Sequence, residues 1–370
     1  MKCTDTLTAV WITVQCPSRV PVGKYHQTIK IEGSKHFTIQ LDYNVHHTTI
    51  PLKSSIPITV GVENRCMTEC LNDKEADKER QRWVDFVLSY RMTPVFGTQI
   101  TPERWQYEHS FSPWAWNDKR SIRLLNDRRY SCYMLPFFTL SENELASLLC
   151  NIQKKGKLKE SLFYIWDEPA YMEDYEQIKR KVNIIRKYAS DARILTTFFC
   201  GPRNGPRKGD LYAVFDYLKH HIHVATISLA PCKGNEEEVQ HIRYKVPEGI
   251  DWWSYVCWQP GGNEPNFLLQ YVRGYSKELS CGVLGKTVAK VFSIGTVIFY
   301  HKRIHLLISL ICHMVMGILI YPGDILGCKG PIASARLERW RDGAVRNGII
   351  AIGGEKLFKR KGRYLIKHSL

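Results

Sequence analysis

The segment LFYIWDEPAYMEDYEQIKRKVNII, residues 162–185, contains a strand, a loop and a helix in succession. Its first five residues are apolar or aromatic, and Pro169 stops the strand because proline has no N–H for a sheet ladder. After the proline, four residues recur on one stripe of an amphipathic helix: Tyr175, Ile178, Val182 and Ile185. The segment therefore predicts one βα unit.

The same pattern repeats along most of the chain. Seven strand starts are separated by about 29 to 36 residues, the size of one βα unit, and lie near Ile58, Pro94, Tyr130, Leu162, Arg193, Ile222 and Trp253. Seven consecutive units favour an α/β fold, a (β/α)8 TIM-type barrel over residues 55–343. A doubly wound open sheet is the alternative, but it needs a glycine-rich phosphate loop after its first strand, and the sequence has none there.

Residues 1–54 follow a different pattern, in which apolar residues alternate with polar ones. The alternation covers 10–14, 29–31 and 37–43, with turn residues between these segments. Such alternation indicates antiparallel strands with one buried face. Three or four strands are too few for a closed sandwich, so we predict a partial antiparallel β-sandwich segment before the barrel.

Charge excludes one class of partner. The chain has 370 residues and a net charge of +16 at pH 7. Residues 341–370 hold eight Lys or Arg and two acids, a net +6, and we interpret residues 344–370 as a basic tail. No basic stripe interleaved with aromatic residues occurs elsewhere, so we predict no nucleic-acid partner.

Cysteine spacing and hydropathy exclude further kinds of site. The 12 cysteines are scattered, and the close pair Cys66 and Cys70 has no second pair to complete a zinc site, so we predict no metal and no cofactor. The N-terminus has no sustained apolar segment typical of a signal peptide, which leaves the compartment open. The apolar stretch Ile304–Tyr321 has about the minimum length of a membrane span, but it contains two histidines, and we interpret it as buried.

Two adjacent carboxylates, Asp167 and Glu168, end the fourth predicted strand. In parallel α/β folds, reactive groups gather at the carboxyl ends of the strands, so the position favours acid–base chemistry. Neighbouring strand residues point to opposite faces, so both acids can meet one substrate only if the strand already turns into its loop. The alternative is that Asp167 caps the following helix and Glu168 is a surface acid.

An aromatic-rich segment, DWWSYVCWQP at 251–260, ends the seventh predicted strand. Aromatic rings beside polar turn residues at this end of a barrel suit a sugar, because pyranose C–H faces stack on rings while hydroxyl groups bind amides and acids. The same rings could equally be core.

Taken in order, these motifs resemble those of a known enzyme family. IWDEP at 165–169 is followed by WWSYVCWQP at 252–260, PNF at 265–267, ILIYPG at 318–323, PIASARLE at 331–338 and RDG at 341–343. The set is similar to the catalytic domain of glycoside hydrolase family 123, and PVGKY at 21–25 resembles the end of that family's sandwich domain. The resemblance covers about residues 17–343.

The resemblance implies release of terminal β-linked N-acetylgalactosamine from a glycan or glycoconjugate by substrate-assisted retaining hydrolysis. Glu168 would be the general acid/base, and Asp167 would hold the acetamido N–H. Tyr255 would bind the acetamido oxygen, and four tryptophans would bind the substrate by walling the pocket: Trp166, Trp252, Trp253 and Trp258. Substrate assistance explains adjacent acids, because no second carboxylate nucleophile is needed across the sugar.

The resemblance fails between about residues 282 and 316, where the family's aromatic-rich approach to its eighth strand is replaced by aliphatic and basic residues. The run MVMG at 314–317 requires codons ATG GTN ATG GGN, and a frame shifted by two bases encodes Gly-Asp-Gly there when N is G. We interpret 282–316, and the tail after Gly343, as translated out of frame, which would leave the barrel incomplete at its eighth strand.

Two other functions stay open from sequence. An incomplete barrel could be an inactive or noncatalytic carbohydrate-binding relative. A retaining glycosidase with an ordinary carboxylate nucleophile is a third possibility, with Glu264 as the nearest candidate.

Overall fold

The computed structural model describes residues 16–17, 19–33, 36–47, 52–54, 57–63, 71–101, 106–199, 202–206, 208–228, 246, 248–256, 292–294, 320–322, 329–334, 337–338 and 340–341. The chain divides into two compact units, Met1–Pro51 and Leu52–Leu370. The predicted domain boundaries at residues 54 and 343 stay predictions.

The first unit contains an antiparallel hairpin. Strands β1 (Gly23–Ile31) and β2 (Phe37–Val45) pair along their whole length, with Ile29 opposite Ile39. Both coincide with segments of predicted alternation. The predicted strand at residues 10–14 lies outside the described residues, and the sandwich stays a prediction.

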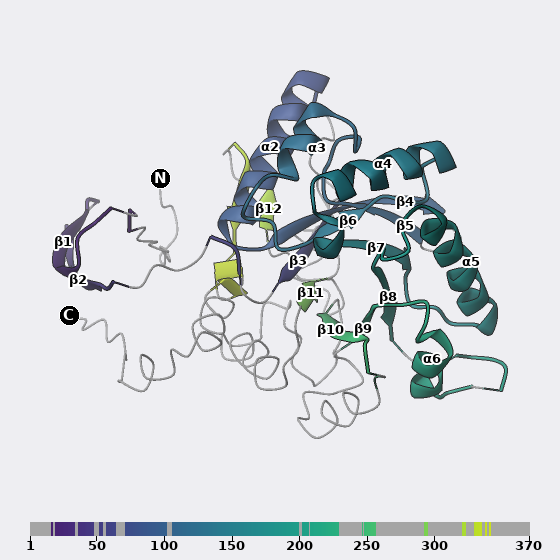
Figure 1. Ribbon diagram of the computed structural model, residues 1–370. Helices are drawn as coiled ribbons and strands as arrows, with labels where there is room; N and C mark the ends of the chain where they lie inside the picture. The colour runs from purple at the N-terminus through teal and green to yellow at the C-terminus, as the bar shows by residue number, and fades with distance from the viewer. Residues whose placement is uncertain are drawn as a thin grey trace. The chain divides into compact units, whose positions relative to one another are not determined.

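The second unit is built on a nine-stranded sheet (Figure 1). Its strands, in chain order, are β3 (Ile58–Glu63), β4 (Thr93–Thr101), β5 (Gln106–Ser110), β6 (Tyr133–Leu135), β7 (Ser161–Trp166), β8 (Ile194–Phe198), β9 (Val224–Ser228), β10 (Asp251–Val256) and β11 (Phe292–Ile294). The spatial order is β5-β4-β3-β11-β10-β9-β8-β7-β6, and every pairing is parallel except that of β4 with β5. The parallel sheet confirms the α/β class, and all seven predicted strands are present.

In the described part of the chain, helices lie between β3 and β4 and between the successive strands from β5 to β9. They are α2 (Asp73–Ser89), α3 (Lys119–Leu124), α4 (Glu142–Lys154), α5 (Met172–Tyr188) and α6 (Leu211–Leu218), with a short 3-10 turn η2 (Leu158–Glu160) before β7. The predicted capping box of α4 is present, since Ser141 Oγ accepts the Glu144 N–H while Glu144 accepts the Ser141 N–H. In α5, the whole predicted stripe from Tyr175 to Ile185 is buried.

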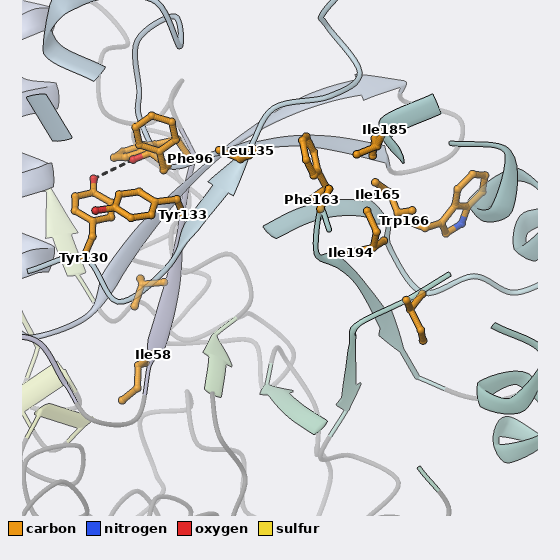
Figure 2. Close-up of a cluster of buried hydrophobic side chains, with 14 of the residues drawn as sticks. Ile58, Phe96, Tyr130, Tyr133, Leu135, Phe163, Ile165, Trp166, Ile185 and Ile194 are labelled. Carbon is orange, nitrogen blue, oxygen red and sulfur yellow. Dashed lines mark hydrogen bonds between the residues drawn. The ribbon is translucent and has the colours of Figure 1, made fainter. Parts of the chain in front are cut away.

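The two faces of the sheet form two separate cores. The larger core joins the helices to one face of the strands and includes Phe163, Ile165 and Ile185, which Figure 2 draws together. The smaller core draws no residue from the described helices, and consists of Val95, Cys132, Met134, Leu162, Leu195, Val224 and Trp253 with Tyr164 packed against them. Because residues 162 and 163 belong to different cores, β7 is buried on both faces, as strands of parallel sheets are.

The strands at the two ends of the spatial order touch each other. Phe111, just after β5, donates its backbone N–H to the carbonyl oxygen of Met134 in β6 at 2.7 Å. Glu108 of β5 accepts the backbone N–H groups of Phe137 and Thr139, each at 2.8 Å, in the loop that follows β6. A flat nine-stranded sheet would hold these strands far apart.

The region in which the barrel is predicted to be incomplete contains β11, which lies between β10 and β3 and pairs with both over three residues. Farther along, β12 (Ile320–Pro322) and β13 (Pro331–Ala333) form an antiparallel pair. Ile320, Leu337 and Trp340 are at most 1% exposed within the larger core. The chain after residue 319 therefore contributes to the core of this unit. Of the two segments interpreted as out of frame, about residues 282–316 and the tail after Gly343, the described residues include 292–294 alone, so the shifted-frame interpretation stays a prediction.

The sequence predicts no membrane span and no metal site, and the described residues include only part of the segments concerned. Among the described residues, no helix has the length and apolarity to cross a membrane, and no cluster of His, Cys, Asp or Glu could hold a metal ion. Cys66, Cys70 and residues 304–319 lie outside the described residues.

Candidate functional site

The acid pair lies where β7 leaves its regular geometry. Tyr164 pairs with Leu195 of β8, but Trp166 pairs with Thr196, so the register shifts between residues 164 and 166. Tyr164 and Asp167 consequently meet on the same side of the sheet, although they are three residues apart. Regular alternation would place Asp167 on the face opposite Tyr164, and the irregularity at the strand end brings it to the same face.

Asp167 is held by two hydroxyl groups on one of its oxygens. Tyr164 donates to Asp167 Oδ1 at 2.5 Å, and Thr197 of β8 donates to the same oxygen at 2.9 Å. Within the described part of the chain, no hydrogen bond ends on Asp167 Oδ2. The arrangement fixes the carboxyl plane and leaves the second oxygen for another donor.

Glu168 adopts a backbone conformation that is uncommon for a side-chain-bearing residue. Its φ is 44°, in the left-handed region, which costs about 1 to 2 kcal/mol for residues other than glycine. Arg91 also has a positive φ, but it follows the last turn of α2, where such a conformation is ordinary. Glu168 lies two residues after the end of β7, and its N–H donates to Thr197 Oγ1 at 2.8 Å. Strain of this kind is typical of functional sites.

The Glu168 carboxyl reaches a partner from a distant strand. Tyr255 of β10 donates its hydroxyl proton to Glu168 Oε1. Glu168 is exposed as a whole residue although its carboxyl group is partly buried, whereas Tyr255 is only 7% exposed. A buried phenol thus orients a carboxyl group that solvent or a ligand can reach.

Both acids have raised pKa values. Burial raises the pKa of Asp167, and the hydrogen bonds from Tyr164 and Thr197 partly offset that rise. Burial also raises the pKa of Glu168, with a smaller contribution from the charge of Asp167, while the Tyr255 hydrogen bond lowers it. Two interacting carboxyls favour a state with one proton over a range of pH. Hydrogen bonding alone favours the proton on Glu168, because Asp167 receives two donors and Glu168 one.

The predicted tryptophans occupy different places. Trp166 is 7% exposed, lies in the larger core, and has Lys181 of α5 at 6.0 Å from its ring centroid, so it faces the helices (Figure 2). Trp252 lies in the same core. The register shift after Tyr164 accounts for the position of Trp166, and the predicted role of both residues as pocket walls stays a prediction. Trp253 lies in the smaller core, on the Tyr164 side.

Trp258 and Glu264 lie outside the described residues. The structure therefore brings together Asp167, Glu168 and Tyr255 from the predicted set, joined by two hydroxyl-bearing residues that sequence reasoning missed, Tyr164 and Thr197. Their signal was present but weak, since each is a polar residue near the carboxyl end of a largely apolar strand.

His109 of β5 completes the side of the site opposite β8. Its ring meets the Tyr164 ring edge-on, with centroids 4.2 Å apart. Burial lowers the pKa of His109 to about 4, so the imidazole is neutral above that pH. It supports the Tyr164 ring without adding charge.

Comparison with known proteins adds a limited finding. No family model matches the chain, and no curated protein matches its sequence. Among solved structures, a psychrophilic glycoside hydrolase family 10 endo-β-1,4-xylanase matches 78% of this chain and 96% of its own, with 11% identity and a TM-score of 0.38. A family 51 α-L-arabinofuranosidase from Bifidobacterium longum matches 80% of this chain and 74% of its own, with 11% identity and a TM-score of 0.46.

A chitinase domain from Pyrococcus furiosus matches 82% of this chain and 98% of its own, with 9% identity and a TM-score of 0.39. These three similar structures are glycoside hydrolases.

Proposed function

We propose that this protein is a glycoside hydrolase that releases terminal β-linked N-acetylgalactosamine by substrate-assisted retaining catalysis. The observation that carries the proposal is the adjacent pair in which Asp167 is fixed by two hydroxyl groups and Glu168 is exposed and oriented by Tyr255. The family 123 resemblance of the motifs around both acids agrees with it.

We further infer that the sheet closes into a (β/α)8-type barrel around this site. Adjacent strands lie about 4.8 Å apart, so β7 and β10, three positions apart, would be roughly 14 Å apart in a flat sheet. A hydrogen bond between Tyr255 and Glu168 calls for strong curvature. The 4.2 Å approach of the His109 and Tyr164 rings, from β5 and β7, supports closure at the other side.

The carboxylate arrangement favours assistance by the substrate. A retaining enzyme with its own nucleophile places two carboxyls about 5 Å apart on opposite sides of the sugar. Among the described residues, Asp167 is the single carboxylate whose charge raises the pKa of Glu168. Two adjacent residues of one strand end approach a sugar from one side, which leaves the 2-acetamido group as the nucleophile.

The reaction then follows from the protonation states. Glu168 donates its proton to the leaving glycosidic oxygen as the acetamido carbonyl oxygen attacks the anomeric carbon and the glycosidic bond breaks. Asp167 Oδ2 accepts the acetamido N–H and offsets the positive charge that develops on the ring formed. Glu168, now ionised, removes a proton from the water that reopens this ring, and the β configuration is retained.

Hydrolysis of an N-acetyl-β-galactosaminide whose leaving group needs protonation tests the proposal, with Glu168→Gln and the surface variant Glu176→Gln as a matched pair. We expect turnover by the wild type and by Glu176→Gln, a large loss in Glu168→Gln, and inhibition of the wild type by a thiazoline analogue of the cyclised intermediate. Equal activity in Glu168→Gln and the wild type would refute the acid role. Turnover that the thiazoline does not inhibit would favour a carboxylate nucleophile, with Glu264 as the candidate.

A noncatalytic carbohydrate-binding role is the second candidate, because the family resemblance fails over about residues 282–316, where the eighth strand is expected. Binding of N-acetylgalactosamine by the wild-type protein, without hydrolysis of any N-acetyl-β-galactosaminide, would support that role over the enzyme.

A further inference from the structure

One side chain touches both members of the acid pair. Thr197 Oγ1 donates to Asp167 Oδ1 at 2.9 Å and accepts the backbone N–H of Glu168 at 2.8 Å. Thr197 is 6% exposed and lies on β8, in register with Thr226 of β9. A hydroxyl group has one proton to donate and lone pairs to accept, so it can make both bonds at once.

The proton directions around this hydroxyl are consistent with each other. The Glu168 N–H can only donate, which makes Thr197 Oγ1 the acceptor there. The Thr197 proton then goes to Asp167, and the Tyr164 proton goes to the same oxygen. Because both hydroxyl protons go to Asp167, the 3.0 Å contact between the Tyr164 and Thr197 oxygens is not a hydrogen bond in this arrangement. Two donors on Oδ1 suit an ionised Asp167.

We propose that Thr197 is a positioning residue that couples the two acids, fixing the ionised Asp167 through its hydroxyl proton and the left-handed backbone of Glu168 through its oxygen. The inference rests on the proposed function, for which Asp167 must be charged while Glu168 keeps its proton. Tyr164 assists as the second donor to Asp167. Thr197 reaches neither the sugar nor the leaving group directly in this assignment.

The neighbouring Thr196 provides a matched control. It is fully buried, and its Oγ1 has no hydrogen-bond partner in the described part of the chain. Thr196→Val and Thr197→Val therefore remove the same atoms from adjacent residues of β8, but only the second removes a bond to the acid pair. Thr197→Ser keeps the hydroxyl group and tests rescue.

The experiment is a titration of the Asp167 carboxyl by carbon-13 NMR, with the signal assigned through its loss in Asp167→Asn. In Thr197→Val, we expect the midpoint to rise by about one pH unit, because one donor to the carboxylate is lost. Thr196→Val and Thr197→Ser should titrate as the wild type does. Thermal unfolding of each variant shows whether it is folded.

Turnover is measured alongside on a chromogenic N-acetyl-β-galactosaminide. We expect at least a tenfold loss of kcat with little change in KM in Thr197→Val, and recovery in Thr197→Ser. An unchanged Asp167 midpoint in folded Thr197→Val, or an equal rise in Thr196→Val, would overturn the positioning role. Absence of turnover in the wild type would refute the proposed function, while the titration would still decide whether Thr197 controls Asp167.

Discussion

Replacing Tyr255 with phenylalanine removes the hydroxyl group that donates to Glu168 Oε1 and leaves the ring in place. That hydrogen bond stabilises the ionised form of Glu168, so it lowers the pKa of the carboxyl against the rise caused by burial and by Asp167. Its loss raises the pKa of Glu168. As a general acid, Glu168 must be protonated, and activity falls as the pH rises through its pKa.

The size of the change follows from the kind of bond. A hydrogen bond to a charged group contributes about 1.5 to 3 kcal/mol, and one pKa unit corresponds to 1.36 kcal/mol. Because the Glu168 carboxyl group is only partly buried, solvent replaces part of the lost interaction, and the lower end of the range applies. We expect the alkaline limb of the pH profile to move up by about one pH unit in Tyr255→Phe.

The assay is kcat/KM against pH on an N-acetyl-β-galactosaminide, which reports the ionisations of the free enzyme. Asp167→Asn provides a variant with the opposite sign: it removes the charge that raises the pKa of Glu168, so the alkaline limb of its residual activity should move to lower pH. An alkaline limb that stays in place, or falls, in Tyr255→Phe would refute the assignment of Glu168 as the acid.

Three further predictions concern other parts of the site and fold. Glu168→Gln should lose about 10²- to 10⁴-fold in kcat on a substrate whose leaving group needs protonation. The loss should be far smaller on a substrate with a nitrophenyl leaving group, which departs without protonation. Equal losses on both substrates would contradict the acid role. Burial raises the pKa of Asp167 in the folded protein, so the protonated carboxyl stabilises the fold fully below the pKa of the unfolded chain, and this contribution is lost as the pH rises through the folded pKa. Asp167→Asn should therefore raise Tm at pH 8 and not at pH 3. Trp340→Ala should lower the free energy of unfolding by about 3 to 5 kcal/mol in denaturant titrations, because the side chain is fully buried, whereas exposed Lys329→Ala should not.

Much of the fold was accessible from sequence because its periodicities are strong. The helix stripe that contains Tyr175 and Ile185, and the capping box at Ser141, place α5 and α4 directly. Strand β5 was not predicted. Glu108 and His109 are polar residues, which do not indicate a buried strand. Glu108 is bound by the loop after β6 and His109 packs against Tyr164, and both partners are distant along the chain.

The site was accessible in part. Asp167 and Glu168 stand out as adjacent acids before a proline, and Tyr255 follows from the family resemblance. Alternation alone could not assign the face of Trp166, because a register shift between residues 164 and 166 reverses it. Thr197 was missed because its role depends on hydrogen bonds to another strand, which no local pattern encodes.

The central claim is that the acid pair works with an acetamido-bearing substrate. The most direct test compares hydrolysis of two β-galactosides that share a leaving group and differ only at carbon 2, one with an acetamido group and one with a hydroxyl group. We predict cleavage of the acetamido substrate alone, with loss of that cleavage in Asp167→Asn. Comparable cleavage of both substrates, or cleavage of the acetamido substrate that Asp167→Asn leaves intact, would contradict the claim.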